Sequence, residues 1–331
     1  TPGPGEVVIE MKASGMCGSD LHAYRAQRSG GGMGAALGLG GSGGPVIAGH
    51  EPCGVIVARG PGVSATQAPE GARVMNHHYW GCGSCKHCRL GWSQLCGKGI
   101  VVFGVTGDGG HARYLKAPAQ TMVPLPDPLS FEEGAAISCG TGTAYGALHR
   151  MGLIGEHTIA IFGQGPVGLS ATLLANAMGA RVIALDVGAE RRALASEFGA
   201  ETVIDPRATD PVLALKELTH GEGVDLALDC SASPEARAAA VRSVRTWGTV
   251  CFVGEGGEVN LNVSQDLLRR QVTLIGSWTF SSVGQMECAR FIAERRIPLK
   301  RLITHRFSLE QAAEAYRLFD TQTTGKGVFL F

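Results

Sequence analysis

The chain has 331 residues, of which 44% are hydrophobic and 18% are charged, a composition typical of a globular protein. Its 29 basic and 29 acidic residues give a net charge of +0, which argues against binding to nucleic acid or to an anionic membrane surface. No apolar run approaches the roughly 20 residues that a membrane span needs, and the length favours two domains over one.

The first part of the chain predicts short strands separated by Gly and Pro turns, as in a barrel-like domain. These strands are expected over residues 6–12, 55–58 and 72–75. The chain begins at Thr1 without a Met, so we expect residues upstream. The glycine-rich segment 29–44 predicts a flexible surface insert; a phosphate-binding loop is disfavoured because Pro45 follows it and no helical pattern begins there.

Four cysteines with the spacing C-x2-C-x2-C-x7-C follow in a segment that we expect to be a loop. Four thiolates at such spacing are typical of a closed structural zinc site. An iron–sulfur run is disfavoured because its last spacing would be x3 before Pro. A redox C-x-x-C pair would start a helix, and disulfides are not expected in a chain of this size. The predicted ligands of the structural zinc are Cys82, Cys85, Cys88 and Cys96.

The chain contains ten cysteines, which we expect to be reduced, and this favours a cytoplasmic location. Four of them lie in apolar or helical surroundings and are predicted to be buried core thiols: Cys53, Cys230, Cys251 and Cys288.

From about residue 153 the pattern alternates between strands and helices, which predicts a doubly wound parallel sheet. A helix is expected over 166–178, and the last part of the chain, after 276, is expected to return to the first domain. The predicted strands are 158–162, 181–186, 202–204, 224–229, 249–253 and 272–276, followed by helices over 285–294 and 309–318 and a strand over 327–331.

A dinucleotide fingerprint, G-x-G-x-x-G, lies between the first strand and the first helix of this part. The glycines allow a tight turn, a close approach to the pyrophosphate, and packing of helix on strand. Asp186 ends the next strand and can bind the ribose hydroxyls while repelling a 2′-phosphate, which favours NAD over NADP; Arg191 and Arg192 keep NADP open. The predicted cofactor-binding residues of the fingerprint are Gly163, Gly165, Pro166, Val167 and Gly168.

Three further motifs remain: Cys17 with Ser19, Asp20 and His22; His50 with Glu51; and Cys139. With the four cysteines and the fingerprint, they make the chain resemble the zinc-dependent medium-chain dehydrogenase/reductase family, which includes alcohol, polyol and threonine dehydrogenases. The resemblance covers essentially the whole chain. It implies a GroES-like catalytic domain over 1–145 and 282–331, with a structural-zinc lobe at about 81–97, and an NAD-binding Rossmann domain over 146–281.

The resemblance also implies roles for single residues. Cys17, His50 and Cys139 would bind a catalytic zinc, the second zinc of the chain, and Glu51 would lie beside it. Asp20 would orient His50, while Ser19 and His22 would pass the alcohol proton to solvent. Positions that match cofactor or substrate contacts of the family are Thr143 (nicotinamide), Lys326 (pyrophosphate), and His78 and Tyr79 (substrate pocket).

The family resemblance thus predicts an oxidoreductase that transfers a hydride from a small alcohol, a secondary alcohol or polyol being favoured, to NAD. A homodimer or homotetramer is expected. The alternatives are an NADP-dependent aldehyde or ketone reductase, a zinc-free quinone or enoyl reductase, which the two metal motifs disfavour, and a non-catalytic protein that binds zinc and nucleotide.

Overall fold

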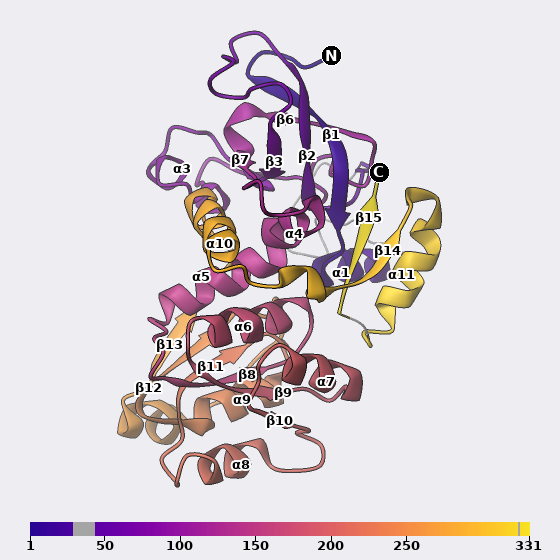
Figure 1. Ribbon diagram of the computed structural model, residues 1–331. Coiled ribbons are helices and arrows are strands. Elements are labelled where there is room, and N and C mark those ends of the chain that lie inside the picture. The colour runs from indigo at the N-terminus through magenta and orange to yellow at the C-terminus, as the bar shows by residue number, and fades with distance from the viewer. Residues whose placement is uncertain (29–43, 324) are drawn as a thin grey trace. The chain divides into compact units, whose positions relative to one another are not determined.

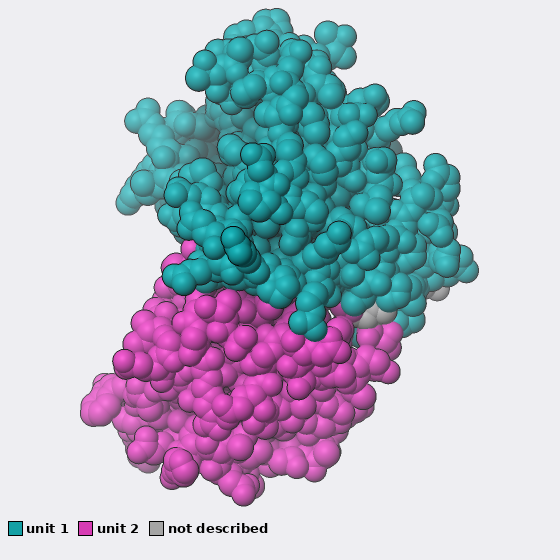
Figure 2. All heavy atoms as spheres, viewed as in Figure 1, with its two compact units in different colours: residues 1–142, 280–322, 326–331 teal, residues 143–279, 323–325 magenta. Residues whose placement is uncertain are grey.

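The computed structural model describes residues 1–28, 44–323 and 325–331, so the predicted glycine-rich insert 29–44 lies almost entirely outside the described residues. The chain forms two compact units. Unit 1 comprises residues 1–142, 280–322 and 326–331, and unit 2 comprises 143–279 and 323–325 (Figure 2). The sequence-based boundaries at 145/146 and 281/282 therefore fall within three residues of these divisions.

Unit 2 contains a six-stranded sheet in which every neighbouring pair of strands is parallel, with the order β10-β9-β8-β11-β12-β13 (Figure 1). The four central strands are rich in buried Val, Ile, Leu and Ala, as expected where helices cover both faces of a sheet. The strands are β8 (Thr158–Phe162), β9 (Arg181–Leu185), β10 (Thr202–Ile204), β11 (Val224–Asp229), β12 (Val244–Phe252) and β13 (Thr273–Gly276).

Helices connect these strands, and their apolar residues join the strands in one core that includes Phe162, Leu215 and Val241. Three of the helices begin with proline at the first helical position, where the missing N–H costs no hydrogen bond. The helices of this part are α5 (Gly142–Arg150), α6 (Pro166–Ala177), α7 (Ala189–Glu197), α8 (Pro211–Glu217), α9 (Pro234–Ser243) and the turns η4 (Val263–Leu267) and η5 (Leu268–Arg270).

Unit 1 is built on a seven-stranded sheet with the order β14-β15-β1-β2-β3-β7, in which β6 also pairs with β1. Strand β15, near the end of the chain, pairs antiparallel with β1 and parallel with β14, so the last strand completes the sheet that the first one starts (Figure 1). A separate two-stranded sheet joins β4 to β5. The strands are β1 (Glu6–Gly15), β2 (Glu51–Arg59), β3 (Arg73–Asn76), β4 (Tyr79–Trp80), β5 (Val101–Val102), β6 (Tyr114–Pro118), β7 (Met122–Pro124), β14 (Ile303–Phe307) and β15 (Lys326–Leu330).

The helices of unit 1 come from both ends of the chain. Helices α1 (Gly18–Arg28) and α11 (Ala312–Asp320) pack with β14 and β15 around Met16, Phe307 and Phe329. Ser130 caps α4 through a capping box with Glu133. The remaining elements are α3 (Lys86–Arg89), η1 (Ser93–Leu95), η2 (Ala119–Thr121), α4 (Phe131–Ala136), the π-helical turn η3 (Ile137–Thr141), α10 (Ser282–Glu294), η6 (Leu299–Leu302) and η7 (Leu309–Gln311).

Several predicted elements need correction. The segment of four cysteines is not wholly a loop, because α3 and η1 each form a helical turn within it. The helix predicted over 309–318 begins as a 3-10 turn and becomes α-helical only at Ala312. Helix α1 and strand β14 were not predicted. No helix in the described part of the chain is both long and apolar enough to cross a bilayer.

Candidate active site and metal centres

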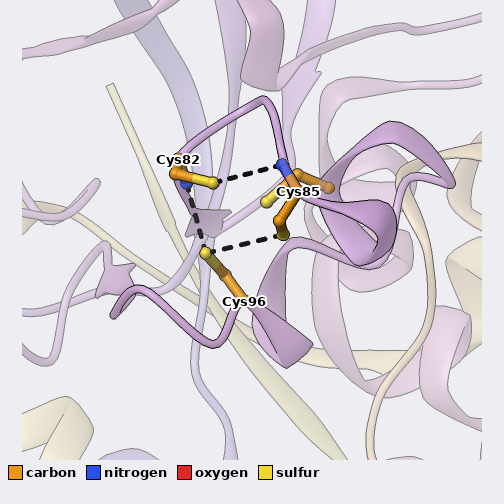
Figure 3. A group of neighbouring side chains, drawn as sticks. Cys82, Cys85 and Cys96 are labelled. Atoms are coloured by element: carbon orange, nitrogen blue, oxygen red, sulfur yellow. Dashed lines mark hydrogen bonds between the residues drawn. The ribbon is translucent and has the colours of Figure 1, made fainter.

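The four cysteines of the lobe come together in unit 1. The sulfur atoms of these cysteines all lie within 4.8 Å of one another: Cys82, Cys85, Cys88 and Cys96. Zn–S bonds of about 2.3 Å in a tetrahedron put sulfurs about 3.8 Å apart. The Sγ atoms of Cys85 and Cys96 are 3.9 Å apart (Figure 3), so this donor set fits zinc.

Backbone groups of the lobe also hold the sulfurs. The amide of Cys82 donates to the Cys96 sulfur, and the amide of Cys85 donates to the Cys82 sulfur, each over 3.4 Å (Figure 3). The hydroxyl and backbone amide of Ser84 lower the pKa of Cys82 to about 5, which favours the thiolate that binds metal. A Cβ atom at Gly81 would lie 2.7 Å from the Cys88 sulfur, so only glycine leaves room for the cluster there.

A second group of possible metal ligands is formed by Cys17, His50, Glu51 and Cys139, all of them buried, with ligand atoms within 4.8 Å of one another. Three of them come from different local structures. Cys17 precedes α1, and His50 precedes β2 after Gly49, which has a φ of +95° that favours glycine. Cys139 lies in the π-helical turn η3, an irregularity that is common at functional sites.

The spacing of these atoms also fits zinc, because the sulfurs of Cys17 and Cys139 lie 3.9 Å apart. The Asp20 carboxylate holds the Nδ1 atom of His50 at 3.1 Å and accepts the Cys17 amide at 2.7 Å. Because Nδ1 of His50 is hydrogen-bonded to Asp20, its Nε2 atom is left to bind a metal, as in sites where a carboxylate orients a histidine ligand. The pKa of Cys17 is lowered, first by its contact with Cys139 and then by His50, which favours the thiolate.

Glu51 and Lys326 form a completely buried ion pair beside these ligands. The Nζ atom of Lys326 lies 2.5 Å from Oε2 of Glu51 and also donates to the Met16 carbonyl over 3.0 Å. The other carboxylate oxygen accepts the Gly140 amide at 3.4 Å. Lys326 therefore lies at the second metal group, and its predicted contact with a pyrophosphate stays a prediction.

The predicted proton-transfer and substrate residues also belong to unit 1. Ser19 is half-buried and His22 is exposed, both on helix α1. His78 and Tyr79 are buried, with ring centroids 4.1 Å apart. Nδ1 of His78 donates to the Ser138 carbonyl over 2.8 Å, and its ring centroid lies 5.3 Å from that of His50. The His78 ring is thus near the second metal group.

The fingerprint of unit 2 adopts the turn that its glycines predict. Gly163 has a φ of +87°, and helix α6 begins at Pro166 with Gly165 as its N-cap. A Cβ at Gly165 would meet no atom within 4 Å, whereas one at Gly168 would lie 1.8 Å from the Gly163 carbonyl oxygen. Gly168 therefore serves packing, and Gly165 leaves the surface above the helix N-terminus open to an anion.

The acidic end of β9 is tied to this turn. The two carboxylate oxygens of Asp186 accept the amides of Gln164 at 2.6 Å and Gly188 at 2.7 Å. Arg192 pairs with Asp205 at 3.0 Å, and in the described part of the chain the buried Nε of Arg191 has no hydrogen-bond partner. Thr143 is buried on α5. Beside the fingerprint, Asp186 thus offers a negative charge to a ligand, and Arg191 offers a hydrogen-bond donor.

Comparison with known proteins identifies the family to which the chain belongs. The profile of the alcohol dehydrogenase GroES-like domain matches residues 3–127, and that of the zinc-binding dehydrogenase domain matches 166–294. The chain is 42% identical to an uncharacterized zinc-type alcohol dehydrogenase-like protein, YphC, of Escherichia coli K12, over 100% of this chain and 93% of that protein. The chain belongs to the zinc-dependent medium-chain dehydrogenase/reductase family.

Two further members of this family illustrate its range. A sorbitol dehydrogenase of Bacillus subtilis is 33% identical over 94% of this chain and 85% of its own length. The solved structure of the alcohol dehydrogenase TADH from Thermus sp. ATN1 superposes with a TM-score of 0.87 at 27% identity, covering 100% of this chain and 93% of that one. The Rossmann and GroES-like architecture predicted from the sequence is confirmed, as are zinc-dependent oxidoreduction and a nicotinamide cofactor at the level of the family.

Two groups that lie near the second metal group were not predicted from the sequence. One is the Ser138 carbonyl that fixes the His78 ring. The other is His111, which contacts the backbone before His50. Only the pair Gly109-Gly110 marks this position in the sequence, because glycines there permit a close backbone approach.

Proposed function

We propose that this protein is an NAD-dependent zinc alcohol or polyol dehydrogenase that oxidises a secondary alcohol or polyol to a ketone or aldehyde. The observation that carries the proposal is the buried set of Cys17, His50 and Cys139, with Asp20 bound to the His50 ring. Three protein ligands leave one position of a tetrahedral zinc for substrate, as in catalytic rather than structural sites.

The bound groups would supply the reactive chemistry: zinc lowers the pKa of an alcohol, and the nicotinamide accepts a hydride. The chain's own residues would then hold and move the proton. Asp20 keeps His50 in one tautomer, and Ser19 and His22 offer a hydroxyl and an exposed imidazole along which the alcohol proton can leave. Burial of Cys17, His50 and Cys139 excludes water from the metal side of the site.

NAD is preferred over NADP in this proposal because Asp186 occupies the end of β9 and Val187 follows it. A carboxylate there accepts hydrogen bonds from ribose hydroxyls and repels a 2′-phosphate. Arg191 is the feature that favours the rival NADP-dependent reductase. Equal affinity for NAD+ and NADP+, measured by titration of protein fluorescence, would contradict the preference for NAD.

A polyol substrate is supported by the similarity to the sorbitol dehydrogenase and by the imidazole of His78 beside the metal group. The proposed localisation is cytoplasmic, because none of the ten cysteines, all of which lie in the described part of the chain, forms a disulfide. A homodimer or homotetramer is also proposed. The exposed edge strand β13 supports it, because such an edge can pair with a second copy.

The test is the reduction of NAD+, followed at the NADH absorbance band, over a panel of polyols, secondary alcohols and primary aromatic alcohols. We expect turnover that a chelator removes and that His50→Ala abolishes while leaving NAD+ affinity unchanged. Silence with both NAD+ and NADP+, from protein carrying two zincs per chain, would favour the non-catalytic alternative. Loss of NAD+ binding in folded His50→Ala protein would contradict the role given to His50.

A further inference from the structure

The backbone immediately before His50 is enclosed by a second segment of unit 1, residues 104–111. Three backbone hydrogen bonds join the segments: Gly109 to Ile47 at 2.8 Å, Gly110 to Gly49 at 2.7 Å and His111 to Ala48 at 2.9 Å. A Cβ at Gly104 or Gly109 would lie within 2.6 Å of the Gly49 backbone. The segment 104–111 therefore fixes the course of the chain into His50.

The side chain of His111 continues this contact. Its Nδ1 atom lies 2.2 Å from where a Cβ would stand at Gly49, so the ring fills the space beside the residue preceding His50. Nδ1 is also 2.9 Å from the hydroxyl of Ser14, at the end of β1. The ring packs edge-on against the buried Phe329 at a centroid distance of 4.6 Å. His111 is thus held on three sides by the elements that surround the metal group.

The other ring nitrogen of His111 is Nε2. Among the described residues, its buried Nε2 has no hydrogen-bond partner, and neither has the buried hydroxyl of Tyr316 on α11. The two rings are neighbours, with centroids 6.1 Å apart. Asp20, which holds His50, acts electrostatically on both side chains. Buried polar atoms in native proteins are nearly always hydrogen-bonded, in many cases to an internal water.

We propose that His111 is a positioning residue for His50, and that a buried water bonded to His111 Nε2 and the Tyr316 hydroxyl completes this support. The inference rests on the proposed function in one respect, the binding of zinc by His50. His111 touches neither the metal ligands' donor atoms nor substrate in this assignment. It acts by fixing the Gly49–His50 backbone, as residues that surround metal ligands commonly do.

The experiment measures zinc release from the intact protein into excess of a colorimetric chelator. Two zincs per chain give two phases, and His50→Ala identifies the phase that belongs to the Cys17–His50–Cys139 group. His111→Phe keeps a ring of similar size against Gly49 but removes both ring nitrogens. We expect it to accelerate this phase by roughly tenfold to a hundredfold, the range for residues that orient metal ligands, and to leave the four-cysteine phase unchanged.

Two further variants separate positioning from general stability. Tyr316→Phe should accelerate the same phase by a smaller factor. Thr121→Val removes a different buried hydrogen bond of unit 1, from the Thr121 hydroxyl to Asn76 at 2.6 Å, and should alter neither phase. Wild-type release from His111→Phe, or equal acceleration of both phases with a lowered Tm, would overturn the inference. If His50→Ala protein still shows both phases of the wild type, the proposed function itself is overturned.

Discussion

The buried ion pair between Lys326 and Glu51 makes a quantitative prediction for Lys326→Met, a change that keeps side-chain length but removes the ammonium. At a separation of 2.5 Å and an effective dielectric constant of about 20, the two charges attract by about 7 kcal/mol. Much of this offsets the cost of burying them. Burial raises the pKa of Glu51 to about 8 even beside Lys326, so without the ammonium the carboxyl takes up a proton and does not remain as a buried charge. At neutral pH that proton costs up to about 3 kcal/mol, and we expect the free energy of unfolding to fall by no more than this.

The assay is urea denaturation followed by circular dichroism at a fixed zinc concentration, since bound metal itself shifts stability. Lys300→Met is the matched control: its ammonium lies 3.8 Å from Glu132 and its side chain is 63% exposed, so we expect a loss of no more than about 1 kcal/mol. The double variant Lys326→Met/Glu51→Gln should recover part of the loss. Equal effects of Lys326→Met and Lys300→Met, or no recovery in the double variant, would refute the reasoning.

Four other substitutions have clear expected outcomes. Cys85→Ser should reduce the zinc content to one per chain by elemental analysis and lower Tm; a loss of about 3 kcal/mol corresponds to roughly 6–12 °C for a domain of this size. Gly165→Ala should weaken dinucleotide binding about tenfold, or 1.4 kcal/mol, without changing stability. Gly168→Ala should instead destabilise the protein by about 1–3 kcal/mol in thermal unfolding, because the added Cβ would meet the Gly163 carbonyl oxygen. Burial lowers the pKa of His77 to about 4, so between pH 6.5 and 4 the unfolded chain binds a proton that the folded chain does not. The free energy of unfolding of the wild type therefore decreases by up to about 3 kcal/mol as the pH is lowered through this window. The denaturation midpoint of His77→Phe should depend less on pH there than that of the wild type.

The parts of the molecule that the sequence predicts best are those specified locally. The strands of unit 2 are short apolar runs, and the turn at Gly163 is marked by glycines between a strand and a helix, so both follow from neighbouring residues. The two metal groups follow from residue type together with a family resemblance. Strand β14 carries Thr, His and Arg among its five residues, so its own sequence does not predict a strand. Its hydrogen-bonded pairing with β15 makes it one.

The position of Lys326 shows the limit of local signals. Its place in the sequence, near the end of the chain, says nothing about Glu51 or Met16, and only the pairing of β15 with β1 brings them together. His111 is similar, since its contact with Gly49 depends on backbone hydrogen bonds between segments about 60 residues apart. Long-range contacts of this kind leave no periodic pattern in the sequence.

The pairing of β15 with β1 and β14 also orders events during synthesis on the ribosome. Residues 326–330 must emerge before the sheet of unit 1 can close, while the strands and helices of unit 2 are all translated by residue 279. Contacts between residues this far apart close slowly, and domains tend to fold as their sequence becomes available. We therefore expect unit 2 to fold first in the nascent chain, with Cys17, His50 and Cys139 kept in an incomplete unit 1 until Lys326 arrives.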